Sequence, residues 1–144
     1  MNEILQENKN LVERLYRDCI NTGKIPLLDE LIHPEFVGAR GEKGPAGYRH
    51  TISMVRTGFP DAQFTLEDLI AEGDRVVARW RMQGTQLGSF AGFPASQKSV
   101  TQTAIVIYQI RESKIVRAWL QPDSLGLMQQ IGAVPPLGVK APTA

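Results

Sequence analysis

Apolar residues near the start of the chain recur with the period of an α-helix. Their spacings are three, four and seven residues, and Gly23 follows as a helix stop. A long amphipathic helix is therefore predicted, with an apolar side made of Ile4, Leu5, Leu11, Val12, Leu15, Tyr16, Cys19 and Ile20. A short helix is expected around 26–32, because Pro26 suits a first turn. Pro34 then forces His33 out of the helical region, so His33 is expected at a helix end.

Farther along the chain the period of the apolar residues changes from helical to alternating. Residues 35–37 could form a short strand, and Pro45 opens a third helix that ends near Gly58. The predicted strands then run from Phe64 to a turn at 72–74, and over 75–85, 99–111 and 114–121. A last helix follows, capped by Asp123 or Ser124. Three helices, a meander of long strands and a final helix indicate an α+β fold with an antiparallel sheet.

Length and charge narrow the class of protein. The 144 residues suit a single domain over 1–132, followed by a Pro-rich C-terminal tail over 133–144. A net charge of +1 gives no electrostatic reason to expect nucleic acid or an anionic membrane as a partner. No apolar run approaches the length of a membrane span, and the N-terminus does not read as a secretory signal. The sequence therefore predicts a compact cytoplasmic protein.

Cysteine and histidine give no sign of a metal site. The single cysteine, Cys19, excludes an internal disulfide and a cysteine-based zinc site, and its helical spacing with Leu15 and Tyr16 predicts a buried thiol. His33 and His50 lie 17 positions apart without a pattern of carboxylate ligands. No metal and no other cofactor is expected.

Several segments in fixed order resemble the SnoaL-like polyketide (ester) cyclases, and they cover nearly the whole chain up to Gly132. These segments are 33–37 (HPEFV), 44–47 (GPAG), 59–61 (FPD), 68–77 (DLIAEGDRVV), 92–94 (GFP) and 123–132 (DSLGLMQQIG). The resemblance implies the cone-shaped α+β barrel of the NTF2-like superfamily. In that fold helices cover the concave face of a curved sheet, and a ligand pocket lies between them.

The resemblance also implies a chemistry that two positions of this chain contradict. Cyclases of this family close a ring on an aromatic polyketide ester by an intramolecular aldol step. An aspartate on the last strand is the acid/base, and a histidine on the preceding strand helps to hold the substrate oxygens. Alignment on the family pattern puts Leu120 at the aspartate position and Val106 at the histidine position. Neither side chain can move a proton, so the usual aldol mechanism is not expected here.

Strand alternation predicts the walls of the pocket. On the middle strand either the even-numbered set from Val76 to Met82 or the odd-numbered set from Val77 to Gln83 faces inward, and burial preference favours the even, apolar set. On the last strand Val116 is expected to face inward. The predicted lining is Trp80, Met82, Ala104, Val106, Ala118 and Leu120, with polar points at Gln102 and Tyr108. These side chains could instead fill the barrel, but the small Ala104 and Ala118 favour a cavity for an apolar ligand.

Three further residues are candidates for the site. Asp123 is the carboxylate nearest the missing aspartate, but its place before a helix is explained by capping, with acid/base work as the alternative. Tyr16 could point its hydroxyl into the cavity or pack in the core. Arg40 could sit at the pocket mouth or in solvent.

These residues predict a cofactor-independent cyclase of polyketide or natural-product biosynthesis that works mainly by shape. An apolar cavity can fold a flexible substrate so that its reacting ends meet, and a cycloaddition-like closure needs no proton transfer. Tyr108, Gln102 or Tyr16 would donate a hydrogen bond to a substrate carbonyl. Alternatives are an aldol-type cyclase that uses Asp123, and a protein that only binds an apolar ligand. Epoxide hydrolysis ranks last, because the inward positions supply no paired carboxylates.

The second half of the strand over 99–111 is apolar on both faces. Ile105 and Ile107 would lie on the outer face of the sheet, with Arg79 and Arg81 as a polar rim. A homodimer through this convex face is therefore predicted, as the resembling family forms. Alternatively the tail, with Val134, Pro135, Pro136 and Leu137, folds back over the isoleucines.

Overall fold

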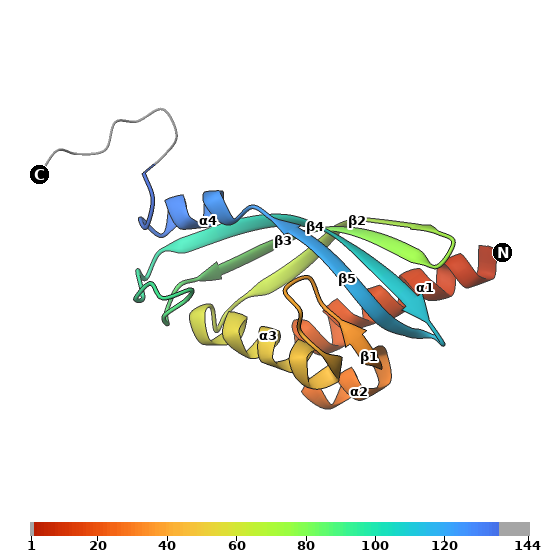
Figure 1. The fold of residues 1–144 in the computed structure, drawn as a ribbon. Coiled ribbons are helices and arrows are strands. Elements are labelled where there is room, and N and C mark those ends of the chain that lie inside the picture. The colour runs from red at the N-terminus through yellow and green to blue at the C-terminus, as the bar shows by residue number, and fades with distance from the viewer. Residues whose placement is uncertain (1, 136–144) are drawn as a thin grey trace, which may run out of the picture.

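A curved five-stranded sheet, three helices on one side of it and a final helix after the last strand make up the fold (Figure 1). The computed structural model describes residues 2–135. The elements are α1 (Asn2–Arg14), a π-helical continuation η1 (Leu15–Ile20), a 3-10 turn η2 (Ile25–Leu27), α2 (Leu28–Leu31), β1 (Ile32–Val37), α3 (Gly44–Gly58), β2 (Gln63–Glu72), β3 (Arg75–Thr85), β4 (Ser99–Arg111), β5 (Lys114–Pro122) and α4 (Ser124–Gln130). The predicted α+β class and the order of its elements are confirmed.

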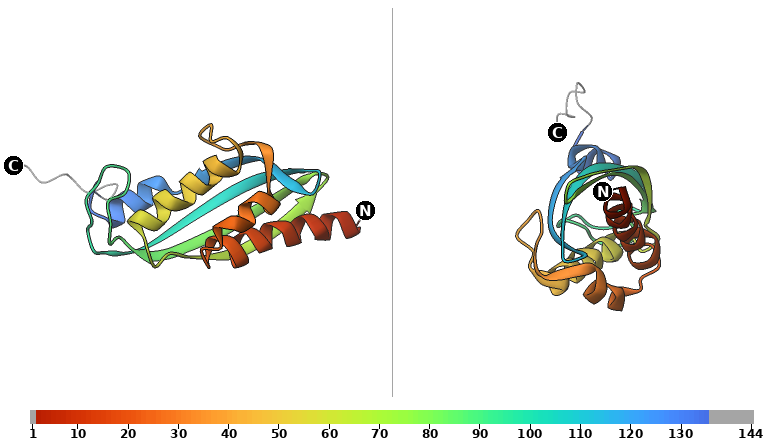
Figure 2. Two further views of the ribbon diagram at one scale, coloured as in Figure 1. Left: turned by 90° about the horizontal axis from the view of Figure 1, so that it is seen from below. Right: turned by 90° about the vertical axis from the view of Figure 1, so that its right-hand side faces the viewer.

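The sheet has the strand order β1-β5-β4-β3-β2. Strands β2 to β5 form the predicted antiparallel meander, whereas β1 joins the edge of β5 in a parallel orientation, so the sheet is not purely antiparallel. Helix α1 packs against β2 and β3, and α3 packs against β1. Figure 2 shows the strands curving around these helices. This arrangement has the cone shape expected for the NTF2-like superfamily.

The inward side of the sheet follows the predicted alternation on β3 and β4. Val76, Ala78, Trp80 and Met82 are all buried, and so are Ala104, Val106 and Tyr108. The odd-numbered residues of β3 face outward, where Arg79 pairs with Asp68 on β2 at 2.7 Å. Burial preference alone therefore identified the correct face of the central strand.

The alternation fails on β5, where the prediction for Val116 is wrong. Gln109 of β4 lies opposite Arg117, but the next residue, Ile110, lies opposite Ile115. Val116 is thus the extra residue of a β-bulge, and the bulge shifts the inward positions by one. Ile115 is fully buried in its place, while Val116 is half-buried.

His33 is not a helix-end residue, because β1 already begins at Ile32. The side chain of His33 is 10% exposed, and its Nε2 lies 3.4 Å from the carboxylate of Glu112. Pro34 does exclude the helical conformation, as predicted, and the chain continues as an edge strand, where a missing N–H is tolerated.

The C-terminal prediction falls mostly outside the described residues, which end at Pro135. The suggestion that Pro136 and Leu137 cover the outer isoleucines therefore lies outside them too. Among residues 2–135, no helix is long and apolar enough to cross a membrane.

Candidate functional site

A cavity of about 240 Å³ lies between the concave face of the sheet and the helices η1 and α3. Its walls are mostly apolar and come from eight of the elements and their loops. The predicted residues that line it are Trp80, Met82, Val106, Ala118, Leu120, Gln102, Tyr108, Tyr16 and Arg40. Ala104 is buried but does not reach the wall. The side chains therefore do not fill the barrel, and an apolar cavity remains.

All three tyrosines of the chain meet in this cavity. Tyr16 from η1 and Tyr48 from α3 approach Tyr108 on β4, whose hydroxyl oxygen lies 2.5 Å from that of Tyr16 and 3.3 Å from that of Tyr48. Burial raises the pKa of each phenol above its ordinary value. The three hydroxyls are therefore protonated and neutral at physiological pH. We call these residues the tyrosine triad.

The triad has one more proton than its internal hydrogen bonds use. Three hydroxyls carry three protons, and the two O···O contacts centred on Tyr108 use two of them. One O–H is therefore left to donate to an acceptor placed in the cavity. Such a donor in an apolar site is suited to a carbonyl oxygen or to the negative charge that develops on it.

The sequence pattern indicated Tyr16 and Tyr108 as site residues but not Tyr48. A signal was available, because Tyr48 lies four positions before Ile52 and seven before Val55, so all three share one face of α3. Phe36 of β1 packs against Tyr48 with ring centroids 5.5 Å apart. That contact depends on the pairing of β1 with β5, which the local pattern did not predict.

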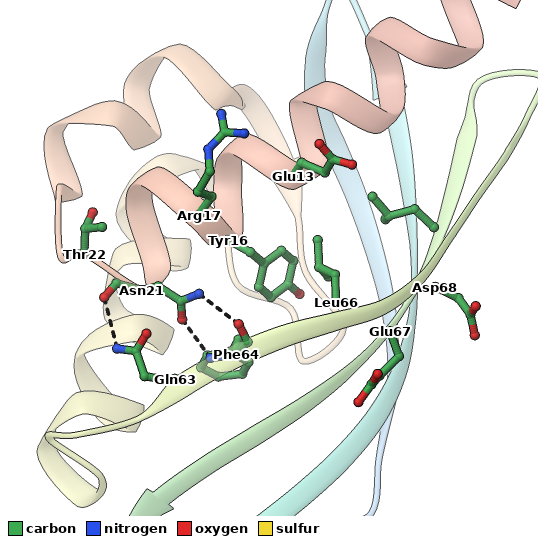
Figure 3. Close-up of a pocket in the computed structure, with 11 residues that line it drawn as sticks. Glu13, Tyr16, Arg17, Asn21, Thr22, Gln63, Phe64, Leu66, Glu67 and Asp68 are labelled. Atoms are coloured by element: carbon green, nitrogen blue, oxygen red, sulfur yellow. Dashed lines mark hydrogen bonds between the residues drawn. The ribbon is translucent and has the colours of Figure 1, made fainter.

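Aromatic contacts hold the wall around Tyr16. The ring of Phe64 lies 5.9 Å from that of Tyr16 and 4.9 Å from that of Trp80, measured between centroids. Phe64 is fixed in turn by Asn21, whose side-chain amide donates to the backbone O of Phe64 at 2.8 Å and accepts from its N–H at 2.7 Å (Figure 3). Asn21 thus forms with the backbone of Phe64 the two hydrogen bonds that a neighbouring strand would otherwise form with the edge strand β2.

Tyr16 and Phe64 also separate the cavity from an open groove of about 580 Å³ on the outer surface, between the end of α1 and β2 (Figure 3). The groove is more polar than the cavity and includes Glu13, Arg17 and Glu67. Sequence reasoning did not identify it, because its two sides are far apart in the chain.

Three charged side chains line the cavity: Arg40 and Glu42 from the loop between β1 and α3, and Arg56 from the last turn of α3. Arg40 is exposed and is one of the residues that line the cavity, which agrees with its predicted position at the pocket mouth. Arg56 donates to the backbone O of Pro60 at 3.2 Å and to that of Ile20, so its guanidinium is committed to main-chain acceptors. Glu42 is the one carboxylate among the described residues that line the cavity, and the sequence analysis did not single it out.

The two positions at which the sequence pattern predicts a departure from the family lie side by side. Val106 and Leu120 are paired across β4 and β5, and both contribute to the cavity wall. This part of the wall is therefore an aliphatic surface that cannot move a proton.

Asp123 has the capping role that the sequence favoured. Its Oδ1 accepts a hydrogen bond from the N–H of Gly126 at 2.8 Å, at the start of α4. The side chain is exposed and does not line the cavity, unlike its neighbours Pro122 and Ser124. Gln102, which does line it, has its amide 3.5 Å from the backbone O of Asp123.

Within residues 2–135 the structure has no group of three His, Cys, Asp or Glu side chains that could hold a metal ion. Cys19 is buried as predicted, and burial raises the pKa of its thiol.

A curved sheet that encloses an apolar cavity under its helices defines the class of NTF2-like proteins. Residues 10–131 match the sequence profile of the SnoaL-like polyketide cyclases. The chain belongs to this family, as its motifs indicated.

Individual relatives agree with this assignment. The chain is 28% identical over 122 residues to nogalonic acid methyl ester cyclase of Streptomyces nogalater, a match that covers 79% of this chain and 90% of the relative. It superimposes on TsrD from Streptomyces laurentii with a TM-score of 0.83 and 33% identity, covering 90% of this chain and 97% of TsrD. IdmH from Streptomyces antibioticus, a putative polyketide cyclase, gives a TM-score of 0.75 and 25% identity over 87% of this chain and 98% of IdmH.

Proposed function

We propose that this protein binds an apolar, polyketide-like small molecule in the cavity and promotes closure of a ring within it. The observation that carries the proposal is the tyrosine triad, which leaves one O–H donor at a mostly apolar wall. The family supports the reaction class, and a relative at 28% identity is a cyclase that acts on a methyl ester.

Positioning supplies most of the rate in this proposal. A flexible chain that is held folded, with its reacting ends in contact, avoids an entropy loss that can reach about 7–11 kcal/mol in the most favourable intramolecular reactions. The rings of Phe64, Trp80 and Tyr16 pack on one another and so present a rigid wall. The aliphatic pair Val106 and Leu120 extends this wall without adding a polar group.

The triad activates a carbonyl of the bound molecule. A hydrogen bond from a neutral hydroxyl withdraws electrons from the carbonyl, which favours either a cycloaddition or attack by a carbon nucleophile. The donor remains protonated over the physiological range because burial raises the pKa of all three phenols.

Ring closure of this kind is an isomerisation, and this property gives a direct test. Deletion of the gene is expected to cause accumulation of an open-chain compound, which the purified protein converts to a cyclic product of the same mass. Tyr108→Phe, which removes the central hydroxyl but keeps the ring, is expected to slow this conversion by roughly tenfold or more.

A binding protein without catalytic activity is the competing function, and the same experiment separates the two. A ligand that is bound by the purified protein and recovered unchanged would favour it. For a catalyst, Trp80→Ala is expected to lower the turnover of bound substrate; for a binder, it can change only the affinity.

Assembly and location are further parts of this proposal. On the convex face, Ile70, Val77, Ile107 and Trp119 lie in register across four strands, and Ile70 is 62% exposed. Beside this row Arg79 is paired with Asp68, and the guanidinium groups of Arg75 and Arg117 lie over the ring of Trp119, so the apolar row has a basic rim. We propose a cytoplasmic homodimer that is packed through this face.

A further inference from the structure

We propose that Glu42 is the proton acceptor of the cavity, acting on an acidic C–H next to the carbonyl group that the tyrosine triad holds. The inference rests on the proposed function and deepens it. Glu42 is the one carboxylate among the described lining residues, and it does not come from β4 or β5, where the family pattern would place the proton-transferring groups.

The side chain of Glu42 is held in a defined position. It belongs to the loop between β1 and α3, and each carboxylate oxygen accepts one hydrogen bond, from the backbone N–H of Arg40 at 2.7 Å and from the hydroxyl of Thr51 at 3.2 Å. The loop leaves little space around it, because a Cβ at Gly38 or Gly47 would come within 3.0 Å of Glu42. The contact at Gly38 is with the carboxylate of Glu42, and the contact at Gly47 is with its backbone and Cβ.

The carboxylate keeps its capacity to accept a proton. Two hydrogen bonds occupy only about half of the roughly four lone-pair sites of a carboxylate. In the described part of the chain no Lys, Arg or His side chain forms an ion pair with Glu42. The other ionisable side chains that line the cavity are Arg40, Arg56, Tyr16, Tyr48 and Tyr108.

The carboxylate and the triad lie close enough to act on one molecule. Thr51, which bonds Glu42, is one turn along α3 from Tyr48 of the triad. Burial is the main cause of the raised pKa of Tyr48, and the negative charge of Glu42 adds to it, so the two groups are within electrostatic reach. A carbonyl compound bound between them presents its oxygen to the triad and its neighbouring carbon to Glu42.

The chemistry balances without another reactant. The proton passes from the C–H carbon to the Glu42 carboxylate, and the electron pair that it leaves forms an enolate, whose oxygen accepts the hydrogen bond of the triad. The enolate carbon then attacks a second carbonyl carbon of the same molecule, so that a C–C bond forms and an alkoxide results. The proton returns from Glu42 to this alkoxide. The substrate class is thus a compound with an acidic C–H beside one carbonyl and a second carbonyl within reach.

A nitrobenzisoxazole is a suitable probe for a carboxylate base in an apolar site. The base removes the proton of the ring C–H, the N–O bond breaks, and a coloured phenolate is released. The purified protein is expected to give saturable elimination above the buffer background, and Glu42→Gln to lower it by at least about tenfold. Glutamine keeps an oxygen that accepts from Arg40. Glu72→Gln, at the exposed β2–β3 turn, is the matched control and is expected to leave the rate unchanged.

Binding of the same probe is measured separately, by quenching of Trp80 fluorescence in a Trp119→Phe background. We expect the parent and Glu42→Gln to bind the probe equally well. Only Glu42→Gln is expected to lose the elimination activity. Equal binding with equal elimination rates, or binding without any elimination, would overturn the role of Glu42 and leave the proposed cavity intact. A probe that does not bind at all would contradict the accessible cavity, and the inference would fall with the proposed function.

Discussion

Removing the central hydroxyl of the triad is expected to cost about twice as much stability as removing either outer one. Tyr108 takes part in both O···O contacts, at 2.5 and 3.3 Å, whereas Tyr16 and Tyr48 take part in one each. A buried hydrogen bond contributes about 1 kcal/mol net, so Tyr108→Phe is expected to lower the free energy of unfolding by about 2 kcal/mol. Tyr16→Phe and Tyr48→Phe are each expected to lower it by about 1 kcal/mol.

Phenylalanine is the appropriate replacement, because it keeps the edge-to-face packing of Tyr16 against Tyr108, at 6.5 Å between centroids. Urea unfolding of the parent and the three variants measures the difference, and thermal unfolding should show Tm lower by roughly 4–8 °C for Tyr108→Phe and half of that for the others. If Tyr108→Phe costs no more than Tyr16→Phe or Tyr48→Phe, the arrangement of the triad around a central hydroxyl is wrong.

Three other predictions test the structure. The raised phenol pKa values mean that the folded protein holds these protons more tightly than the unfolded chain does. The contribution of the three tyrosines to stability is therefore expected to be constant below about pH 10 and to fall above it, by up to about 1.4 kcal/mol per pH unit for each tyrosine. All three tyrosines are in the triad, so tyrosinate absorbance should appear only as the chain unfolds, and its appearance in folded protein near pH 10 would argue against their burial. Asp123→Ala is expected to lower the free energy of unfolding by about 0.5–2 kcal/mol, measured with urea. It is also expected to reduce the destabilisation caused by Gly126→Ala, because the new Cβ would lie 2.2 Å from the Asp123 carboxylate. If the two losses of stability simply add in the double variant, this contact is wrong. In sedimentation, Ile105→Asp with Ile107→Asp is expected to convert a dimer to monomers, and a parent that is monomeric at micromolar concentration would refute the interface.

The prediction for the inward face of the sheet succeeded on β3 and failed at one point of β5 for a common reason. Alternation is a local property of an extended chain, so Val76 to Met82 could be assigned from their apolar character alone. The bulge at Val116 arises from the pairing of β5 with β4, where two residues of one strand oppose one residue of the other. No local pattern in residues 114–121 indicates it.

The sequence by itself determined the class of fold, the motifs of the family and most of the apolar cavity wall, because period, turn residues and burial preference all act within short stretches of chain. The tertiary structure alone decided which polar groups share that cavity. Tyr16, Tyr48 and Tyr108 come from η1, α3 and β4, and they meet only because α3 and η1 pack over the concave face. Glu42 was overlooked for the same reason: its place at the cavity depends on how one loop crosses the start of α3, and backbone bonds across that loop hold it there.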